Sequence, residues 1–129
     1  MRYLCGMQLQ LVAESGSTKT EWALIVDGVW AETRTTAGYN PHVMRPAMLE
    51  AQLRADVARL ALPASPASIF FFGAGFSTAA SCQGFAALLQ DIFGCPEVRV
   101  RHDLDAACLA CWGHQPGAVG IMGTGSNAA

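Results

Sequence analysis

Apolar and polar residues alternate along the first third of the chain with a period of two, the period of a half-buried strand. This alternation predicts strands over residues 7–14, 21–27 and 29–36. Asp27–Gly28 is a hairpin turn signal, and the segment 15–20 is rich in small polar residues. The chain is therefore expected to open with three consecutive strands that form a meander.

The spacing of apolar residues then changes to the three-to-four-residue period of a helix. In the segment that ends near residue 60, the apolar residues with this spacing are Leu49, Leu53, Val57 and Leu60. Glu50 precedes Arg54 by four positions, a pair that supports a helix. A second helix is predicted over 77–93, with Gly94 as its C-terminal stop.

Further strands are predicted where short apolar runs follow turn residues. Residues 68–72 form a continuous apolar run, as expected of a strand buried on both faces, and residues 97–101 alternate again. A short helix is predicted over 104–112, and the last strand over 118–122. The order β-β-β-α-β-α-β-α-β predicts an α/β fold, a mixed sheet with helices on its faces.

Composition supports a single packed domain of 129 residues, because 52% of them are hydrophobic and only 14% are charged. The net charge of -2 provides no basic face, so no nucleic-acid partner is expected. No apolar run reaches the roughly 18 residues of a membrane span, so no membrane partner is expected. The five cysteines form no regular framework and are interpreted as reduced thiols in a cytoplasmic protein.

The turn between the first two strands is a candidate anion site. Gly16 permits a tight turn, Ser17 and Thr18 supply hydroxyl donors, and Lys19 is the only lysine of the chain. Glu14 at the strand end could hold Mg²⁺ through water. The spacing is not that of a Walker A loop. The alternative is an ordinary hairpin turn whose polar residues satisfy only the turn itself.

Two other glycine-containing segments follow buried strands. Residues 123–127, Gly-Thr-Gly-Ser-Asn, would allow close backbone approach to a phosphate, although an ordinary turn has the same composition. Gly73-Ala-Gly75 half-resembles a dinucleotide fingerprint, but Thr78 replaces the third glycine. We interpret it as a strand-to-helix turn at the border of a substrate cleft.

Asp103 stands where a predicted strand ends and a helix begins. An aspartate there suits a helix N-cap. The functional interpretation is a general base that takes the proton from a sugar hydroxyl attacking a γ-phosphate, but without other context the N-cap is favoured. Asp105 is the alternative carboxylate, and both interpretations stay open at this point.

Taken together, these segments resemble a known family. Gly-Ser-Thr-Lys-Thr, Gly38-Tyr-Asn-Pro41, Gly73-Ala-Gly75, Asp103-Leu-Asp-Ala-Ala and Gly-Thr-Gly-Ser-Asn resemble the BadF/BadG/BcrA/BcrD ATPase family. Within it, they are most similar to the N-acetylglucosamine kinases of the actin/hexokinase/Hsp70 superfamily. The resemblance implies a ribonuclease H-like fold, an actin-like ATPase lobe with a mixed five-stranded sheet and helices on both faces.

The resemblance also implies ATP and Mg²⁺ as cofactors, an amino sugar such as N-acetylglucosamine as substrate, and roles for individual residues. Asp103 would be the base and would contact the sugar, and Glu14 would serve Mg²⁺. The residues implied in phosphate contact are Gly16, Ser17, Thr18, Lys19 and Thr124. The residues implied in sugar contact are Asn40, Ser126 and Asn127.

The resemblance implies that residues 1–129 form the N-terminal lobe of such a kinase, without the second lobe of the family. Lobe closure positions substrates and excludes water, so the chain alone is expected to have little or no kinase activity. The family would allow a homodimer. Alternative functions are an ATPase that activates a dehydratase or reductase, and a non-catalytic sugar-binding regulator.

Overall fold

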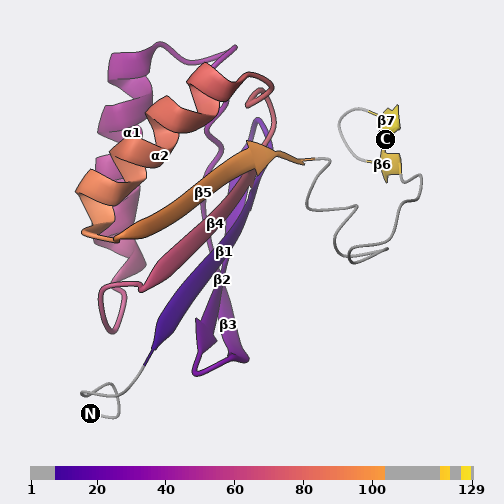
Figure 1. The fold of residues 1–129 in the computed structure, drawn as a ribbon. Helices are drawn as coiled ribbons and strands as arrows, with labels where there is room; N and C mark the ends of the chain where they lie inside the picture. Colours follow the sequence, from indigo (N-terminus) through magenta and orange to yellow (C-terminus); the bar gives the residue numbers. More distant parts are fainter. Residues whose placement is uncertain (1–7, 104–119, 123–125, 129) are drawn as a thin grey trace.

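The computed structural model describes residues 8–103, 120–122 and 126–128, and most of these form one five-stranded sheet beside two helices (Figure 1). The strand order is β3-β2-β1-β4-β5. The strands are β1 (Leu9–Ser15), β2 (Lys19–Val26), β3 (Val29–Ala37), β4 (Ser68–Gly73) and β5 (Glu97–His102). The first three are antiparallel neighbours, and β4 and β5 run parallel to β1. The predicted mixed sheet is confirmed.

The predicted meander is present, with a shorter first turn than expected. Asp27 and Gly28 have φ angles of 51° and 83°, the left-handed pair that closes a two-residue hairpin. Ser15, Lys19 and Thr20 pair within the sheet, so the predicted turn over 15–20 contracts to residues 16–18.

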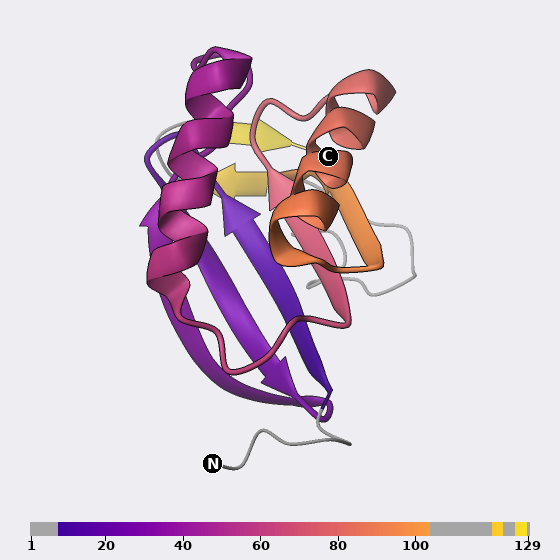
Figure 2. The same cartoon turned by 90° about the vertical axis from the view of Figure 1, so that its left-hand side faces the viewer.

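The helices α1 (Pro46–Leu60) and α2 (Ala79–Phe93) cover the same face of the sheet (Figure 2). A capping box between Thr78 and Ser81 begins α2, and Gly94 ends it in the left-handed conformation, as predicted. The helix predicted over 104–112 falls outside the described residues. A helix on the opposite face of the sheet therefore remains a prediction.

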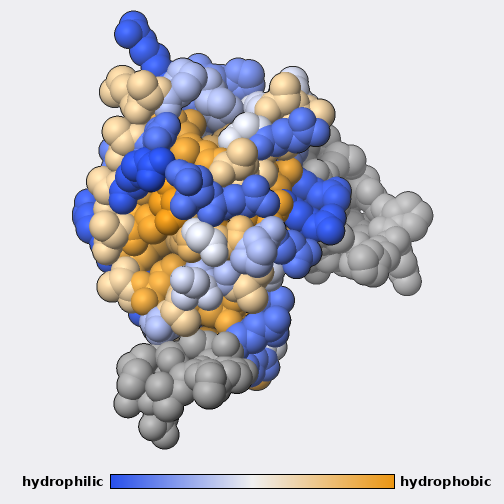
Figure 3. All heavy atoms as spheres, turned by 60° about the vertical axis from the view of Figure 1, so that its left-hand side comes forward, coloured by the Kyte–Doolittle hydropathy of each residue, from blue (hydrophilic) through white to orange (hydrophobic). Residues whose placement is uncertain are grey.

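The core lies between this sheet face and the two helices. Alternate residues of β1 and β2 point towards the helices, and apolar residues of α1 and α2 meet them. Aromatic rings form the centre: Phe85 lies 4.8 Å from both Phe71 and Phe76, and Trp22 lies 5.6 Å from Phe93, between ring centroids. Hydrophilic residues are spread over the surface in Figure 3, with apolar residues visible between them.

Arg34 of β3 joins the edge of the sheet to the end of α1. Its guanidinium donates to the carbonyl oxygens of Leu60 and Ala61, and it pairs with Glu32 at 2.8 Å. These carbonyls have no partner inside the helix, so a cation there stabilises the helix end.

Strand β4 is buried on both faces except at Phe70, as the continuous apolar run predicted. Phe71 is fully buried under the helices, whereas Phe70 points to the opposite face and is 40% exposed among the described residues. Ser68 and Phe72 lie on the same face as Phe70 and are each only 7% exposed, so Phe70 is the one exposed position of this strand.

The other described residues form a small hairpin of β6 (Gly120–Met122) and β7 (Ser126–Ala128), which pair antiparallel. The predicted strand over 118–122 is present in three residues. The expectation of a loop over 123–127 is corrected, because Ser126 and Asn127 belong to β7. In the part of the chain that the structure describes, neither helix is long and apolar enough to cross a bilayer.

Two neighbouring phenylalanines provide a test of this packing. Phe71→Ala is expected to lower the free energy of unfolding by about 3–5 kcal/mol, because it leaves a cavity under both helices. Phe70→Ala is the matched control and should cost less than about 2 kcal/mol, since its ring already contacts water. Urea unfolding measures both, and equal losses would contradict the exposure of Phe70.

Candidate functional site

The candidate site lies at the edge of the sheet where the parallel strands β1, β4 and β5 end. Hydrogen-bond register aligns Ser15 of β1 with Gly73 of β4, and Gly73 with His102 of β5. The backbone N–H of Ala74 also donates to the carbonyl of Ser15 at 2.9 Å. The turn 16–18, the turn after β4 and the end of β5 therefore meet at one edge. Carboxyl ends of parallel strands are where ligands bind in open α/β sheets.

The turn 16–18 presents polar groups to solvent. The amide of Gly16 donates to the carbonyl of Lys19 at 2.9 Å and closes the turn. Ser17, Thr18 and Lys19 are exposed, and the Lys19 ammonium lies 3.9 Å from the Glu21 carboxylate. Because the Gly16 amide is already engaged, an anion here would meet the hydroxyls and the ammonium of the following residues.

The buried Ser15 side chain holds this turn in place, a role that was not expected from the sequence. Its buried hydroxyl oxygen accepts a hydrogen bond from the Thr20 hydroxyl at 2.7 Å and another from the Tyr39 backbone N–H at 3.1 Å. These two bonds join both ends of the turn to the segment that follows β3.

Asn40, the residue expected to reach the sugar, lies against the same turn. Its side-chain amide donates to the Ser17 hydroxyl at 3.2 Å, and its carbonyl oxygen accepts from the backbone N–H of His42 at 2.9 Å. The second bond is an Asx turn that fixes the amide orientation. The structure therefore brings Asn40 and Ser17 together.

Two glycines, Gly38 and Gly75, allow the segment after β3 to approach the turns after β1 and β4 closely. A Cβ atom on Gly38 would lie 2.4 Å from the carbonyl oxygen of Gly16 and 2.6 Å from the carbonyl carbon of Ser17. Gly75 has a φ of 87°, and a Cβ there would lie 2.2 Å from the Asn40 amide oxygen. Gly75 thus lies in a strand-to-helix turn, as predicted, and this turn contacts Asn40.

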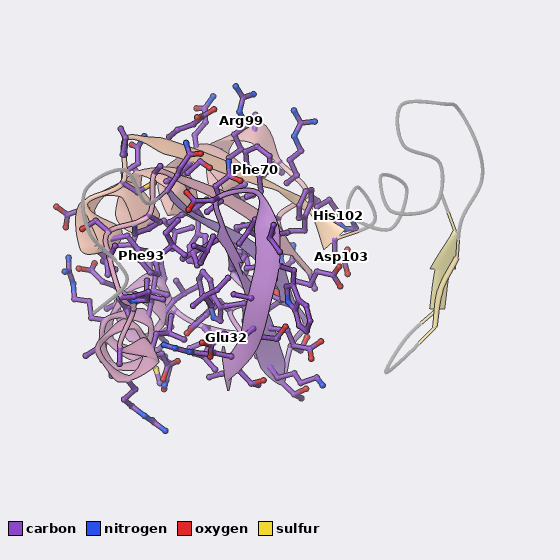
Figure 4. The ribbon with its side chains drawn as sticks, turned by 90° about the horizontal axis from the view of Figure 1, so that it is seen from below. Glu32, Phe70, Phe93, Arg99, His102 and Asp103 are labelled. Atoms are coloured by element: carbon purple, nitrogen blue, oxygen red, sulfur yellow. The ribbon has the colours of Figure 1, made fainter. Side chains whose placement is uncertain are left out.

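Asp103 follows β5 directly and lies beside His102 (Figure 4). The imidazole Nδ1 is 2.9 Å from the Asp103 carboxylate oxygen Oδ1, and the aspartate side chain is 27% exposed. One carboxylate oxygen is therefore held by a neighbour while the group remains accessible to solvent. From sequence alone no role was expected for His102, because a single histidine has no partner at ligand spacing.

Glu14 points to the face of the sheet opposite the helices. It is exposed and pairs in register with Glu21 of β2, so two carboxylates stand side by side near the turn. Carboxylate oxygens suit Mg²⁺, which usually keeps several waters and needs few protein ligands. Among the described residues, no group of three or more histidine, cysteine, aspartate or glutamate side chains is arranged to hold a metal directly.

The remaining expected contacts are not placed by the structure. Thr124 and Asp105 lie outside the described residues. Ser126 and Asn127 are described only as backbone in β7. Their roles stay predictions.

Comparison with solved structures identifies the fold. A candidate N-acetylglucosamine kinase from Porphyromonas gingivalis is 31% identical with a TM-score of 0.83, over 92% of this chain and 42% of that one. A second candidate N-acetylglucosamine kinase, from Chromobacterium violaceum, is 21% identical with a TM-score of 0.64, over 94% and 44%. A chain of the PilM–PilN type IV pilus biogenesis complex is 17% identical with a TM-score of 0.50, over 77% and 37%.

This chain spans less than half the length of each of those three proteins. No family model matches the sequence, and no curated protein matches it. The mixed five-stranded sheet with its two helices is that of an actin-like ATPase lobe, as predicted.

The close approach at Gly38 provides a second test. Gly38→Ala is expected to cost about 1–3 kcal/mol of unfolding free energy, because the added methyl group meets rigid backbone of the turn 16–18. It should also shift the backbone amide resonances of Ser17 and Thr18. Gly84→Ala is the control: open space surrounds that position in α2, so alanine should stabilise the helix by about 0.5–1 kcal/mol. Unperturbed turn resonances in Gly38→Ala would contradict the contact.

Proposed function

We propose that this chain is the N-terminal lobe of an ATP-dependent kinase that transfers the γ-phosphate to an amino sugar, N-acetylglucosamine. The observation that supports this most is the register across β1, β4 and β5. It brings a polar turn and a solvent-accessible carboxylate to one edge of an actin-like ATPase lobe, and the Asn40 amide contacts that turn. The similarity to candidate N-acetylglucosamine kinases supports the choice of sugar.

In this proposal the turn after β1 binds the phosphates. The Ser17 and Thr18 hydroxyls donate to phosphate oxygens, Lys19 compensates their charge, and Gly16 permits the tight turn. Thr124 would contact phosphate from the second glycine segment. Because phosphoryl transfer depends mainly on positioning and electrostatic stabilisation, a rigid turn with a single cation suits this role.

The sugar would lie between Asn40 and Asp103, with Ser126 and Asn127 as further contacts. Asp103 takes the proton from the attacking sugar hydroxyl as that oxygen bonds to the γ-phosphorus, and the bond from phosphorus to the β-γ bridging oxygen breaks to release ADP. The contact with His102 keeps the carboxylate in one orientation during this step.

Glu14 would hold Mg²⁺ through water, near the phosphates. When bound, the ion neutralises charge on the β- and γ-phosphate oxygens. Glu21, its cross-strand neighbour, adds negative charge to the same place. The side chains of both residues are exposed and available to hydrated ligands.

The second lobe of such a kinase would supply most of the adenosine pocket and would close over the sugar. The 129-residue chain alone is therefore expected to bind ligands weakly and to form little ADP, because no closure excludes water. We expect the whole enzyme to work in the cytoplasm.

Asp103→Asn in the two-lobed protein tests this function. The amide cannot accept the sugar proton, so ADP formation that depends on N-acetylglucosamine should fall about 10²–10⁴-fold, with KM for the sugar nearly unchanged. Asp91→Asn, an exposed carboxylate on α2, is the control and should retain full activity. A coupled ADP-release assay measures both. Wild-type turnover by Asp103→Asn would exclude this residue as the base.

A further inference from the structure

A buried chain of hydrogen bonds runs under the candidate site from β2 to α1. The Trp22 indole N–H donates to the Thr36 hydroxyl oxygen at 2.8 Å, and the Thr36 and Tyr39 hydroxyl oxygens are 3.1 Å apart. The Tyr39 hydroxyl lies 2.6 Å from Asp56 Oδ2, and the Gln52 side-chain amide donates to Asp56 Oδ1 at 3.0 Å.

The chemistry of these groups gives the chain one direction. A carboxylate only accepts, so Tyr39 donates its single hydroxyl proton to Asp56. The Thr36 hydroxyl then donates to the phenol oxygen while it accepts from the Trp22 indole. Every polar group in the chain is satisfied, and the described part of the protein has no buried side-chain polar atom without a partner.

Tyr39 is held at both its ends. Its side chain is bound to Asp56 on α1, and its backbone N–H is bound to the Ser15 hydroxyl oxygen under the turn 16–18. Its ring packs 6.2 Å from that of Phe85, between centroids. Asn40 is the next residue, so the position of Tyr39 decides where the Asn40 amide meets Ser17.

We propose that Tyr39 and Asp56 form the positioning pair of this site, which sets the sugar-contacting Asn40 at a fixed distance from the phosphate turn. The proposal rests on the proposed function for the identity of the ligands. Neither residue touches the sugar or the nucleotide. They act through the backbone that joins Tyr39 to Asn40.

Burial of Asp56 supports a role beyond stability. The residue is only 3% exposed, and its one nearby cation, Arg59, lies 3.9 Å from Oδ1 among the described residues. A buried carboxylate loses much hydration, and an apolar residue of similar size often stabilises such a site equally well or better. What the carboxylate adds is one defined orientation of the Tyr39 hydroxyl, because its hydrogen bond is directional.

The Tyr39 hydroxyl keeps its proton, and so remains the donor of this hydrogen bond, above neutral pH as well. Burial, together with the neighbouring Asp56 carboxylate, raises the pKa of Tyr39 far above its ordinary value of 10.0. The phenol therefore stays protonated and keeps its donor in the folded protein at neutral and mildly alkaline pH.

The pair can be removed without leaving a dry cavity. A pocket of about 410 Å³ opens onto Asp56 from the surface, and its polar lining includes Gln52, Arg59 and Thr35. Water entering from this pocket can solvate the Tyr39 hydroxyl in Asp56→Ala. Tyr39→Phe removes only the hydroxyl and keeps the ring packing.

The test uses Tyr39→Phe, Asp56→Ala and the double variant in the two-lobed kinase. Each single variant should raise the KM for N-acetylglucosamine about tenfold and leave the KM for ATP within about twofold, the effect of losing one charge-assisted hydrogen bond. The double variant should lose no more than the worse single variant, because both substitutions break the same bond. Additive losses, or an unchanged sugar KM in Tyr39→Phe, would overturn the proposal.

Val57→Ala, on the same helix, is the control for stability. Val57 packs against the core but has no polar side-chain group and makes none of these hydrogen bonds, so its truncation should destabilise the protein yet leave the sugar KM unchanged. If Val57→Ala raised the sugar KM as much as Tyr39→Phe, a purely structural role would explain both, and the proposal would fail.

A second readout needs no turnover and separates this inference from the proposed function. In the ¹⁵N-labelled 129-residue chain, Tyr39→Phe should shift the side-chain amide resonances of Asn40 and speed their hydrogen exchange, and Val57→Ala should not. Unmoved Asn40 resonances would refute the positioning pair even in an active kinase. If Tyr39→Phe shifts the Asn40 resonances but the wild-type two-lobed protein phosphorylates no sugar, only the proposed function is refuted.

Discussion

The hydrogen-bond register between the parallel strands is the constraint on which the site depends. Because β1 and β4 pair with Ser15 opposite Gly73, and β4 and β5 with Gly73 opposite His102, three strand ends finish level with one another. A slip of one residue would turn every side chain of a strand to the other face. The core prevents such a slip, since Phe71 is packed under both helices and cannot leave that face without exposing its ring.

At the candidate site, loops contact the ends of the parallel strands through backbone atoms. Gly38 and Gly75 let the segment after β3 contact the turns after β1 and β4, and Ser15 bonds that segment from below. Tyr39 extends the connection to α1 through Asp56. The groups that would bind ligand are thus exposed, while those that orient them are buried. This division is expected of a site that works by positioning and electrostatics.

Sequence pattern predicted the strands and both described helices well, because alternation, helical spacing and turn residues such as Asp27–Gly28 agree locally. It missed the burial of Asp56, since a charged residue on a helix is ordinarily assigned to solvent and its partner Tyr39 lies seventeen positions away. Sequence pattern also did not predict that Phe70 is exposed within a strand that is otherwise buried, because a local apolar run does not show which single position lacks cover. For the candidate site, motifs indicated Ser17, Asn40 and Asp103. The role of Ser15 arises only from its tertiary contact with Tyr39, and that of His102 from side-chain geometry beside Asp103.

In the proposed kinase, the turn 16–18 and Asp103 face one bound nucleotide and sugar. Paramagnetic broadening by Mn²⁺–ATP in the ¹⁵N-labelled two-lobed protein, with N-acetylglucosamine present, measures this directly. We expect strong broadening of the Ser17 and Thr18 amides together with that of Asp103, and little effect at Asp27 on the opposite end of the sheet. Broadening that reaches Ser17 but spares Asp103, or that is centred elsewhere, would contradict it.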